Sequence, residues 1–158
     1  MFWSAAALGA ALDYLRGMGN GDLAAGREAL VNNAELAAEM TRAGALALGL
    51  KLFAAAAPAA ALTAVSSPPG IDSGAIVKEF RESFNAVVAN GQGEMKGQLF
   101  RIAHIGYYDY LDTIGILAAL EQVLAAVTSK PVEYGAAVRA AQQVYARHNA
   151  GARQTVNA

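Results

Sequence analysis

Short apolar segments divided by glycine and proline constrain the fold of this chain more than any other sequence feature. Leu62–Ser66 alternates as a strand until a Pro-Pro-Gly run ends it, because proline cannot continue a central strand. A helix follows, with Asp72 or Ser73 as its N-cap. The pattern then predicts further strands over residues 86–89 and 99–103. This part of the chain therefore has the order strand, helix, strand, loop, strand.

Helical segments lie on both sides of these strands. A period near 3.6 residues, good N-caps and glycine stops predict them. The predicted helices cover residues 4–16, 22–48, 109–127 and 132–147, a short strand covers 51–53, and a polar, frayed tail starts at 149. We expect an α+β fold with long N-terminal helices, C-terminal helices and a small, mostly antiparallel sheet of three to four strands that carries its helices on one face.

Charge and composition argue against several classes of function. Twelve basic against thirteen acidic residues give a net charge of −1, and no stretch gathers four Lys or Arg, so we expect neither a nucleic-acid nor a membrane partner. The apolar start lacks a basic flank and is interrupted by Asp13 and Arg16, so it predicts neither a signal peptide nor a membrane span. Because the chain has no cysteine, disulfides and thiolate chemistry are excluded, and a cytoplasmic location is the default expectation.

The chain is unusually apolar, with 55% hydrophobic and only 16% charged residues. An ordinary domain has about 25% charged residues. Much of the excess is alanine, which favours helices and lets them approach closely. Two interpretations stay open: an alanine-rich helical protein, or a domain whose apolar surface contacts a neighbour outside this sequence.

Arg101 is the strongest candidate for a binding residue. It lies in the middle of the predicted strand 99–103 among apolar neighbours, and a buried charge must be paired or must face a ligand. Its planar guanidinium fits a carboxylate through two parallel hydrogen bonds, which is how a site holds an amino acid or a 2-oxo acid. The alternatives are an arginine on a solvated strand face, or one paired with an internal Asp or Glu.

Two further features are weaker candidates. The loop from Asn90 to Gly97 could close over a ligand with its backbone amides, with Gly91, Gln92 and Gly93 as candidate residues, although such turns are common without any ligand. His104 could titrate near neutral pH, but a lone histidine is more often structural.

Aromatic and acidic residues near position 109 favour structural roles. Tyr107, Tyr108 and Tyr110 could stack on a ligand, but packing between the next helix and the sheet is the better expectation. Asp109 and Asp112 stand at a helix start, where capping is the first interpretation. The sequence shows no carboxylate pair suited to hydrolysis, no metal-ligand cluster, no nucleophile elbow and no Walker-type loop. We therefore expect no catalytic residue and no metal site in this chain.

The order of several motifs is more specific than any one of them. The motifs are, in sequence, Leu62-Thr63-Ala64-Val65, Pro69-Gly70-Ile71-Asp72, Gly91-Gln92-Gly93, Lys96-Gly97, Phe100-Arg101-Ile102-Ala103-His104-Ile105-Gly106 and Asp112. Together they resemble the C-terminal small domain of class V, pyridoxal-phosphate-dependent aminotransferases, in the alanine-glyoxylate and serine-pyruvate group with its relatives labelled soluble hydrogenase subunit. The resemblance covers about residues 2–127. It departs at Ala103, where many relatives have glycine.

The resemblance implies a function and a domain layout. The arginine that matches Arg101 binds the substrate α-carboxylate in that family, which moves an amino group between a small amino acid and a 2-oxo acid. Residues 1–50 would be helices that link to a missing N-terminal large domain, 51–128 the small domain, and 129–158 the C-terminal helix and frayed tail. The resemblance also implies a homodimer with the active site at the subunit interface.

The same resemblance places the cofactor machinery outside this sequence. The family's cofactor-binding aspartate, Schiff-base lysine and phosphate-binding segment precede the residue that matches Met1. None of the four lysines present, Lys51, Lys78, Lys96 and Lys130, matches the Schiff-base motif. We expect pyridoxal phosphate in a full-length parent of which this chain is a fragment, and neither cofactor binding nor transamination by the chain alone. Two rival hypotheses are a stand-alone, non-catalytic module that binds an amino acid or another carboxylate, and a structural helical partner protein.

Overall fold

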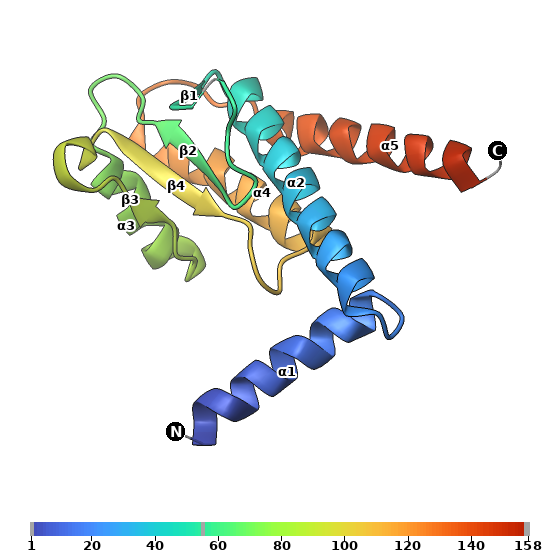
Figure 1. Cartoon of the computed structure of the whole chain (residues 1–158). Coiled ribbons are helices and arrows are strands. Elements are labelled where there is room, and N and C mark those ends of the chain that lie inside the picture. Colours follow the sequence, from blue (N-terminus) through green and yellow to red (C-terminus); the bar gives the residue numbers. More distant parts are fainter. Residues whose placement is uncertain (1, 55, 157–158) are drawn as a thin grey trace.

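A computed structural model describes residues 2–54 and 56–156 of the chain. The strands in this part are β1 (Lys51–Leu52), β2 (Leu62–Ser66), β3 (Ala89–Asn90) and β4 (Leu99–Ala103). They form one antiparallel sheet in the order β1-β2-β4-β3, so β4 has a neighbour on each side (Figure 1). The predicted α+β fold with a small antiparallel sheet is confirmed.

Helices make up most of the rest of the structure. They are α1 (Phe2–Met18), α2 (Leu23–Ala47), α3 (Ser73–Phe84), α4 (Tyr110–Val127) and α5 (Ala136–Val156), and a 3-10 turn, η1 (Gly93–Met95), precedes β4. The predicted N-caps are confirmed, because a carboxylate oxygen of Asp22 accepts a hydrogen bond from the next helix's backbone at 2.8 Å and one of Asp72 does so at 2.6 Å. Asp109 and Asp112 form a reciprocal capping box at the start of α4.

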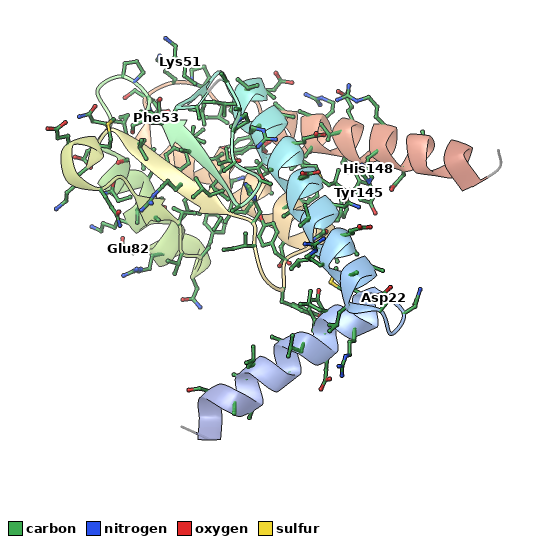
Figure 2. The ribbon with its side chains drawn as sticks, in the orientation of Figure 1. Asp22, Lys51, Phe53, Glu82, Tyr145 and His148 are labelled. Carbon is green, nitrogen blue, oxygen red and sulfur yellow. The ribbon has the colours of Figure 1, made fainter. Side chains whose placement is uncertain are left out.

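Two predicted elements have wrong boundaries. The strand expected over 86–89 begins only at Ala89, because Asn85 takes a left-handed conformation with φ 49° and the chain must leave α3 before it can pair with β4. The last helix, expected over residues 132–147 before a frayed tail, begins only at Ala136, after Gly135 with φ 84°, and continues to Val156. His148 therefore lies within α5 rather than at its end (Figure 2). Residues 157 and 158 lie outside the described residues.

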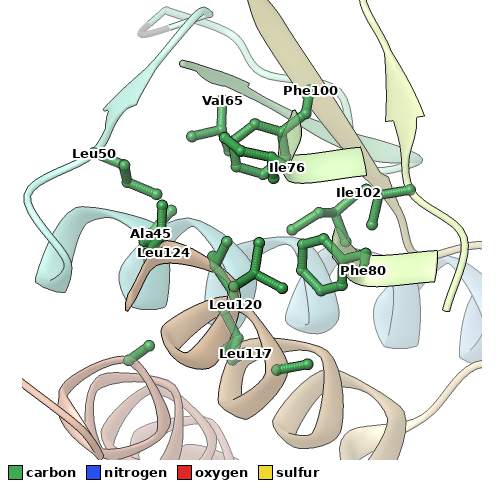
Figure 3. Packing of buried hydrophobic residues seen from close by; sticks show 14 of the residues in the cluster. Ala45, Leu50, Val65, Ile76, Phe80, Phe100, Ile102, Leu117, Leu120 and Leu124 are labelled. Atoms are coloured by element: carbon green, nitrogen blue, oxygen red, sulfur yellow. The ribbon is translucent and has the colours of Figure 1, made fainter. Parts of the chain in front are cut away.

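One face of the sheet carries the hydrophobic core. Val65 and Phe100 are register partners on β2 and β4, both are fully buried, and Ile102 is nearly so. These three side chains lie against residues of α3 and α4 (Figure 3). Burying each such side chain contributes about 1.5–3 kcal/mol to folding. Helices α2, α3 and α4 form the layer beneath this face, and α5 packs against α2 and α4 from outside.

Helix α4 is long and apolar enough to cross a membrane by length and composition alone. Several of its apolar residues instead lie in the centre of the fold, where Leu117, Leu120 and Val123 are fully buried, although Leu111 is 72% exposed. Helix α2 approaches α4 closely at Gly44, where an added Cβ would lie 2.6 Å from a methyl carbon of Leu117. The apolar sequence of α4 is therefore explained by its position between the sheet and its neighbouring helices.

Candidate functional site

Arg101 lies on the face of the sheet opposite the core. Its strand neighbours Phe100 and Ile102 point to the helices, and side chains alternate along a strand, so the Arg101 side chain leaves on the other face. Its register partners are Ala64 on β2 and Ala89 on β3, whose short side chains leave the guanidinium accessible. The sequence suggested a charge inside the core, whereas the structure places a half-buried charge on an open sheet face.

The guanidinium of Arg101 is held from one side. Its Nε and Nη2 groups both donate to the main-chain oxygen of Asn90, at 3.2 and 2.9 Å. No carboxylate among the described residues lies within ion-pair distance of it, so the internal pair considered from the sequence is not found there. The end of the fork formed by Nη1 and Nη2 is left to bind a planar anion through two parallel hydrogen bonds.

The loop before β4 reaches Arg101 through Asn90. The side-chain oxygen of Asn90 accepts hydrogen bonds from the Ser73 hydroxyl at 2.6 Å, from the Gly91 amide at 2.8 Å and from the Gly97 amide at 3.3 Å. From the sequence, Asn90 was considered only as the first residue of a possible ligand loop, and Ser73 only as a possible N-cap. The available signal was an Asn-Gly pair at the end of a strand, which on its own indicates only a turn.

The three weaker loop candidates have different structural roles. Gly91 is buried, and an added Cβ would lie 2.0 Å from the main-chain oxygen of Met95, so only glycine fits. Gly93 is exposed and takes φ 56°, a conformation that favours glycine. Gln92 is exposed and makes no side-chain capping bond to η1. Gly91 shapes the loop, while a ligand role for Gln92 and Gly93 stays a prediction.

His104 has a structural position. Its ring nitrogens lie 2.9 Å from the Thr63 hydroxyl and 2.7 Å from the main-chain oxygen of Ala60. Burial lowers the pKa of His104, the bond to Ala60 partly offsets this, and the positive charge of Arg42 lowers the pKa further. The histidine is therefore neutral near pH 7 and ties the segment before β2 to the sheet.

The tyrosines after β4 separate into packed and exposed positions. Tyr110 packs at a tilt against Tyr145 of α5, with ring centroids 4.2 Å apart, so it has a packing role, but here between two helices rather than between a helix and the sheet. Burial raises the pKa of Tyr108. Tyr107 is 87% exposed, and its ring centroid lies 5.3 Å from that of Tyr14 on α1, so the core position expected for it is wrong. The reason is that the chain turns at Gly106, with φ 84°, before α4 begins.

Known proteins with the same fold share sequence with this chain. No protein-family profile matches it. The small subunit of a soluble hydrogenase from a Synechococcus strain is 38% identical over 122 residues, which are 77% of this chain and 32% of that protein. The L-aspartate–glyoxylate aminotransferase of Paracoccus denitrificans is 31% identical over 134 residues, which are 84% of this chain and 34% of that protein. In the solved structure of pyridoxamine-pyruvate aminotransferase from Mesorhizobium loti, the matching part covers 82% of this chain and 35% of that one, with 29% identity and a TM-score of 0.70.

The chain is homologous to a C-terminal part of class V aminotransferases. The family resemblance seen in the sequence is therefore confirmed. This class V homologue spans about a third of the length of the curated relatives it matches.

The residues of the class V homologue do not fit a complete cofactor site. A lysine that holds pyridoxal phosphate must lie in a sheltered site where its amine can react. Lys51, Lys78, Lys96 and Lys130 are all exposed, and Lys78 is paired with Glu82. Lys51 points away from the body of the molecule (Figure 2). None of the four lysines therefore lies in a sheltered site of the kind that holds pyridoxal phosphate.

Proposed function

We propose that this chain is the substrate-carboxylate-binding small domain of a pyridoxal-phosphate-dependent aminotransferase. The observation that carries the proposal is the Arg101 guanidinium, which lies on the open sheet face with one edge held by Asn90 and its outer end free. The substrates would be a small amino acid and a 2-oxo acid, in keeping with the glyoxylate and pyruvate named for the aminotransferase relatives. Both substrates carry a carboxylate beside the reacting carbon, so one arginine can orient both.

We assign substrate binding to this chain and cofactor binding to a large domain outside it. Pyridoxal phosphate would supply the electron sink for moving the amino group, and its lysine and phosphate-binding residues would come from a large domain outside residues 1–158. Arg101 would fix the substrate's carboxylate and so its orientation. In this layout residues 1–50 connect to the large domain, 51–128 form the small domain, and 129–158 form the C-terminal helix.

Exposed apolar surface supports a neighbouring domain. Helix α1 projects from the body of the molecule in Figure 1, and its Leu8 is 62% exposed and its Leu12 40% exposed. The only charged residues of α1, Asp13 and Arg16, are near each other, so the rest of the helix presents an uncharged surface. Apolar surface of this extent is characteristic of a contact site. We propose that the large domain covers it, that the assembled enzyme is a homodimer, and that it works in the cytoplasm.

The cofactor part of the proposal is tested with this chain as it stands. Incubation with pyridoxal phosphate followed by borohydride should fix the cofactor to no specific lysine, because all four are exposed. Peptide mass mapping reads the result. The same treatment of the native protein purified from its source cells should label one lysine outside residues 1–158. A single labelled lysine within this chain would contradict the proposal.

The role of Arg101 is tested in that native protein. Arg101→Ala should raise KM for the amino acid and for the 2-oxo acid by at least about tenfold each, because a charge-assisted bidentate pair is lost. Arg101→Lys should recover only part of the loss, since an ammonium cannot bond both Asn90 and a carboxylate in one plane. Arg81→Ala, an exposed arginine on α3, is the matched control and should leave both KM values unchanged.

The stand-alone module remains the rival outcome. Calorimetry of this chain with alanine, serine and glyoxylate separates the two ideas. A module should bind one of these ligands through Arg101 without any further domain. The proposed small domain should bind none of them tightly, because a half-buried guanidinium on an open face keeps much of its hydration and gains little from an anion.

A further inference from the structure

We propose that Asn90 is the positioning residue that aims Arg101 at its carboxylate. This inference rests on the proposed function of Arg101, and it concerns how the chain prepares that side chain before any substrate arrives. The main-chain oxygen of Asn90 orients the guanidinium. The side-chain oxygen of Asn90 fixes the loop that carries this main-chain oxygen.

The main-chain oxygen of Asn90 determines which edge of the Arg101 guanidinium is left for a ligand. Nε and Nη2 lie on one side of the fork, and both donate to the Asn90 oxygen, at 3.2 and 2.9 Å. That side is therefore occupied. The remaining pair of parallel donors belongs to Nη1 and Nη2 at the tip, so a carboxylate must approach end-on. An arginine without this partner could rotate about its side-chain bonds and offer either edge.

The Asn90 main chain is itself held by contacts of the Asn90 side chain. Asn90 Oδ1 accepts from the hydroxyl of Ser73 at 2.6 Å, from the amide of Gly91 at 2.8 Å and from the amide of Gly97 at 3.3 Å. Ser73 is fully buried at the first residue of α3. One side-chain oxygen thus joins a helix start and both ends of the loop to β3. The Asn90 backbone is also held by the short pairing of β3 with β4 and by the bond from the Gly91 amide to the Leu99 oxygen at 2.9 Å, and the Oδ1 contacts add to these.

The loop that carries Asn90 also packs closely against the start of α3. The Ser73 amide also donates to the Gly97 oxygen at 3.0 Å, so α3 and the loop are joined twice. An added Cβ at Gly97 would lie 2.7 Å from a carboxylate oxygen of Asp72, the N-cap of α3, and Gly97 takes φ 80°. The helix start therefore serves as a rigid base for the Arg101 site. Sites held by regular elements orient a side chain more accurately than free loops do.

The positioning role predicts a signal that needs no substrate. In ¹⁵N-labelled chain, the Nε–H of Arg101 should exchange with solvent more slowly than the Nε–H of exposed Arg81, because the former is hydrogen-bonded. Asn90→Ala removes all three Oδ1 contacts and should speed the Arg101 exchange by at least about tenfold. Asn90→Asp keeps an acceptor oxygen for the same three donors and should restore slow exchange. Ser73→Ala removes one contact and should have a smaller effect in the same direction.

A matched control separates positioning from general destabilisation. Val123→Ala creates a cavity at a fully buried position of α4, and urea unfolding will show that it lowers stability. The Arg101 exchange rate under native conditions should stay unchanged in this variant. If Asn90→Ala folds and leaves the Arg101 exchange slow, or if Val123→Ala accelerates it equally, the positioning role is wrong. Should Asn90→Ala not fold, Ser73→Ala decides the question by the same measurement.

The outcome for Asn90 can be distinguished from that for the proposed function. The exchange measurement contains no carboxylate and reports only on Asn90 and Arg101. In the native protein purified from its source cells, Asn90→Ala should raise KM for the 2-oxo acid several-fold with a smaller change in kcat, and Asn90→Asp should recover it. Fast Arg101 exchange with unchanged KM would refute the aminotransferase role of Arg101 and leave the positioning geometry standing.

Discussion

The two faces of the sheet differ although they are built from the same two strands. On the covered face, Val65 and Phe100 are fully buried against α3 and α4. On the open face, Ala64 and Arg101 are only half-buried, and the arginine bonds to a main-chain oxygen instead of packing. Val65 pairs with Phe100, and Ala64 pairs with Arg101. The two pairs are one residue apart along each strand. A shift of one residue thus separates the core from the proposed binding surface.

This difference shows how a small domain can present a charge from a central strand. The covered face supplies the burial that stabilises the sheet, so the open face is free to carry residues that do not pack. The charge is kept in place by the antiparallel neighbour β3, which contributes the Asn90 oxygen. Substitutions on the covered face should therefore mainly lower stability, and substitutions on the open face should mainly affect binding.

The largest expected effect comes from neighbouring residues on opposite faces. Phe100→Ala should lower the free energy of unfolding by about 3–5 kcal/mol, because it opens a cavity in the core. Arg101→Ala should lower it by only about 1–2 kcal/mol, from the lost hydrogen bonds to Asn90. Urea denaturation of both variants gives the comparison. Equal losses of unfolding free energy would show that both faces contribute equally to stability, which would contradict the distinction between a covered and an open face.

The next effect concerns the loop that shapes the open face. Gly91→Ala should cost about 1–3 kcal/mol, because its Cβ would have to displace the backbone of Met95. Gln92→Ala, at the exposed neighbouring position, is the control and should change stability by less than about 0.5 kcal/mol. Thermal unfolding monitored by circular dichroism measures both. A neutral Gly91→Ala would mean that the loop is not packed as described.

A smaller effect is expected from the helix beneath the covered face. Asp109→Ala removes the capping box of α4 and should lower the free energy of unfolding by about 1 kcal/mol. Because the cap lies outside the core, the Arg101 Nε–H exchange rate should not change. Hydrogen exchange of the α4 amides will show whether the loss is confined to the first turn. Faster Nε–H exchange at Arg101 would instead show that the start of α4 influences the open face.

The smallest effect is a dependence on pH at the edge of the covered face. Burial lowers the pKa of His104 below its ordinary value of 6.5, so the unfolded chain binds more protons than the folded one as the pH falls below 6.5. The stabilisation is therefore complete above that pH and is lost as the pH falls toward the folded pKa. The unfolding free energy of wild type minus that of His104→Gln, measured from pH 7.5 to 5.5, should decrease toward acid pH. A constant difference would contradict the buried, neutral state of His104.

Local chemistry allowed much of the fold to be predicted. Asp22, Asp72 and Asp109 were expected at helix starts and cap them, because a carboxylate beside free backbone amides acts over two or three residues. The strands β2 and β4 were predicted with their full lengths, since proline, glycine and alternation mark them within a short window. The prediction failed where distant contacts set the limit, as at β3, whose length depends on pairing with β4.

The candidate site was predicted only in part for the same reason. The sequence identified Arg101 as a charge out of place among apolar neighbours, but not Asn90 or Ser73, whose polar side chains are ordinary in a turn. Their role depends on hydrogen bonds that join positions 11 and 17 residues apart along the chain.

By itself the sequence determined the kinds of elements, their caps and the charge in the middle of β4, because these depend on neighbours a few residues away. Tertiary structure alone decided which helices cover the apolar side of the sheet, and that one edge of the Arg101 guanidinium is held by Asn90 on the open face. The alternation of β4 puts Phe100 and Ile102 on one face and Arg101 on the other, but it does not say which helices cover the apolar face or what holds the arginine. The covering helices are α3 and α4, against which Phe100 and Ile102 are buried, because covering the larger apolar surface gains the most free energy.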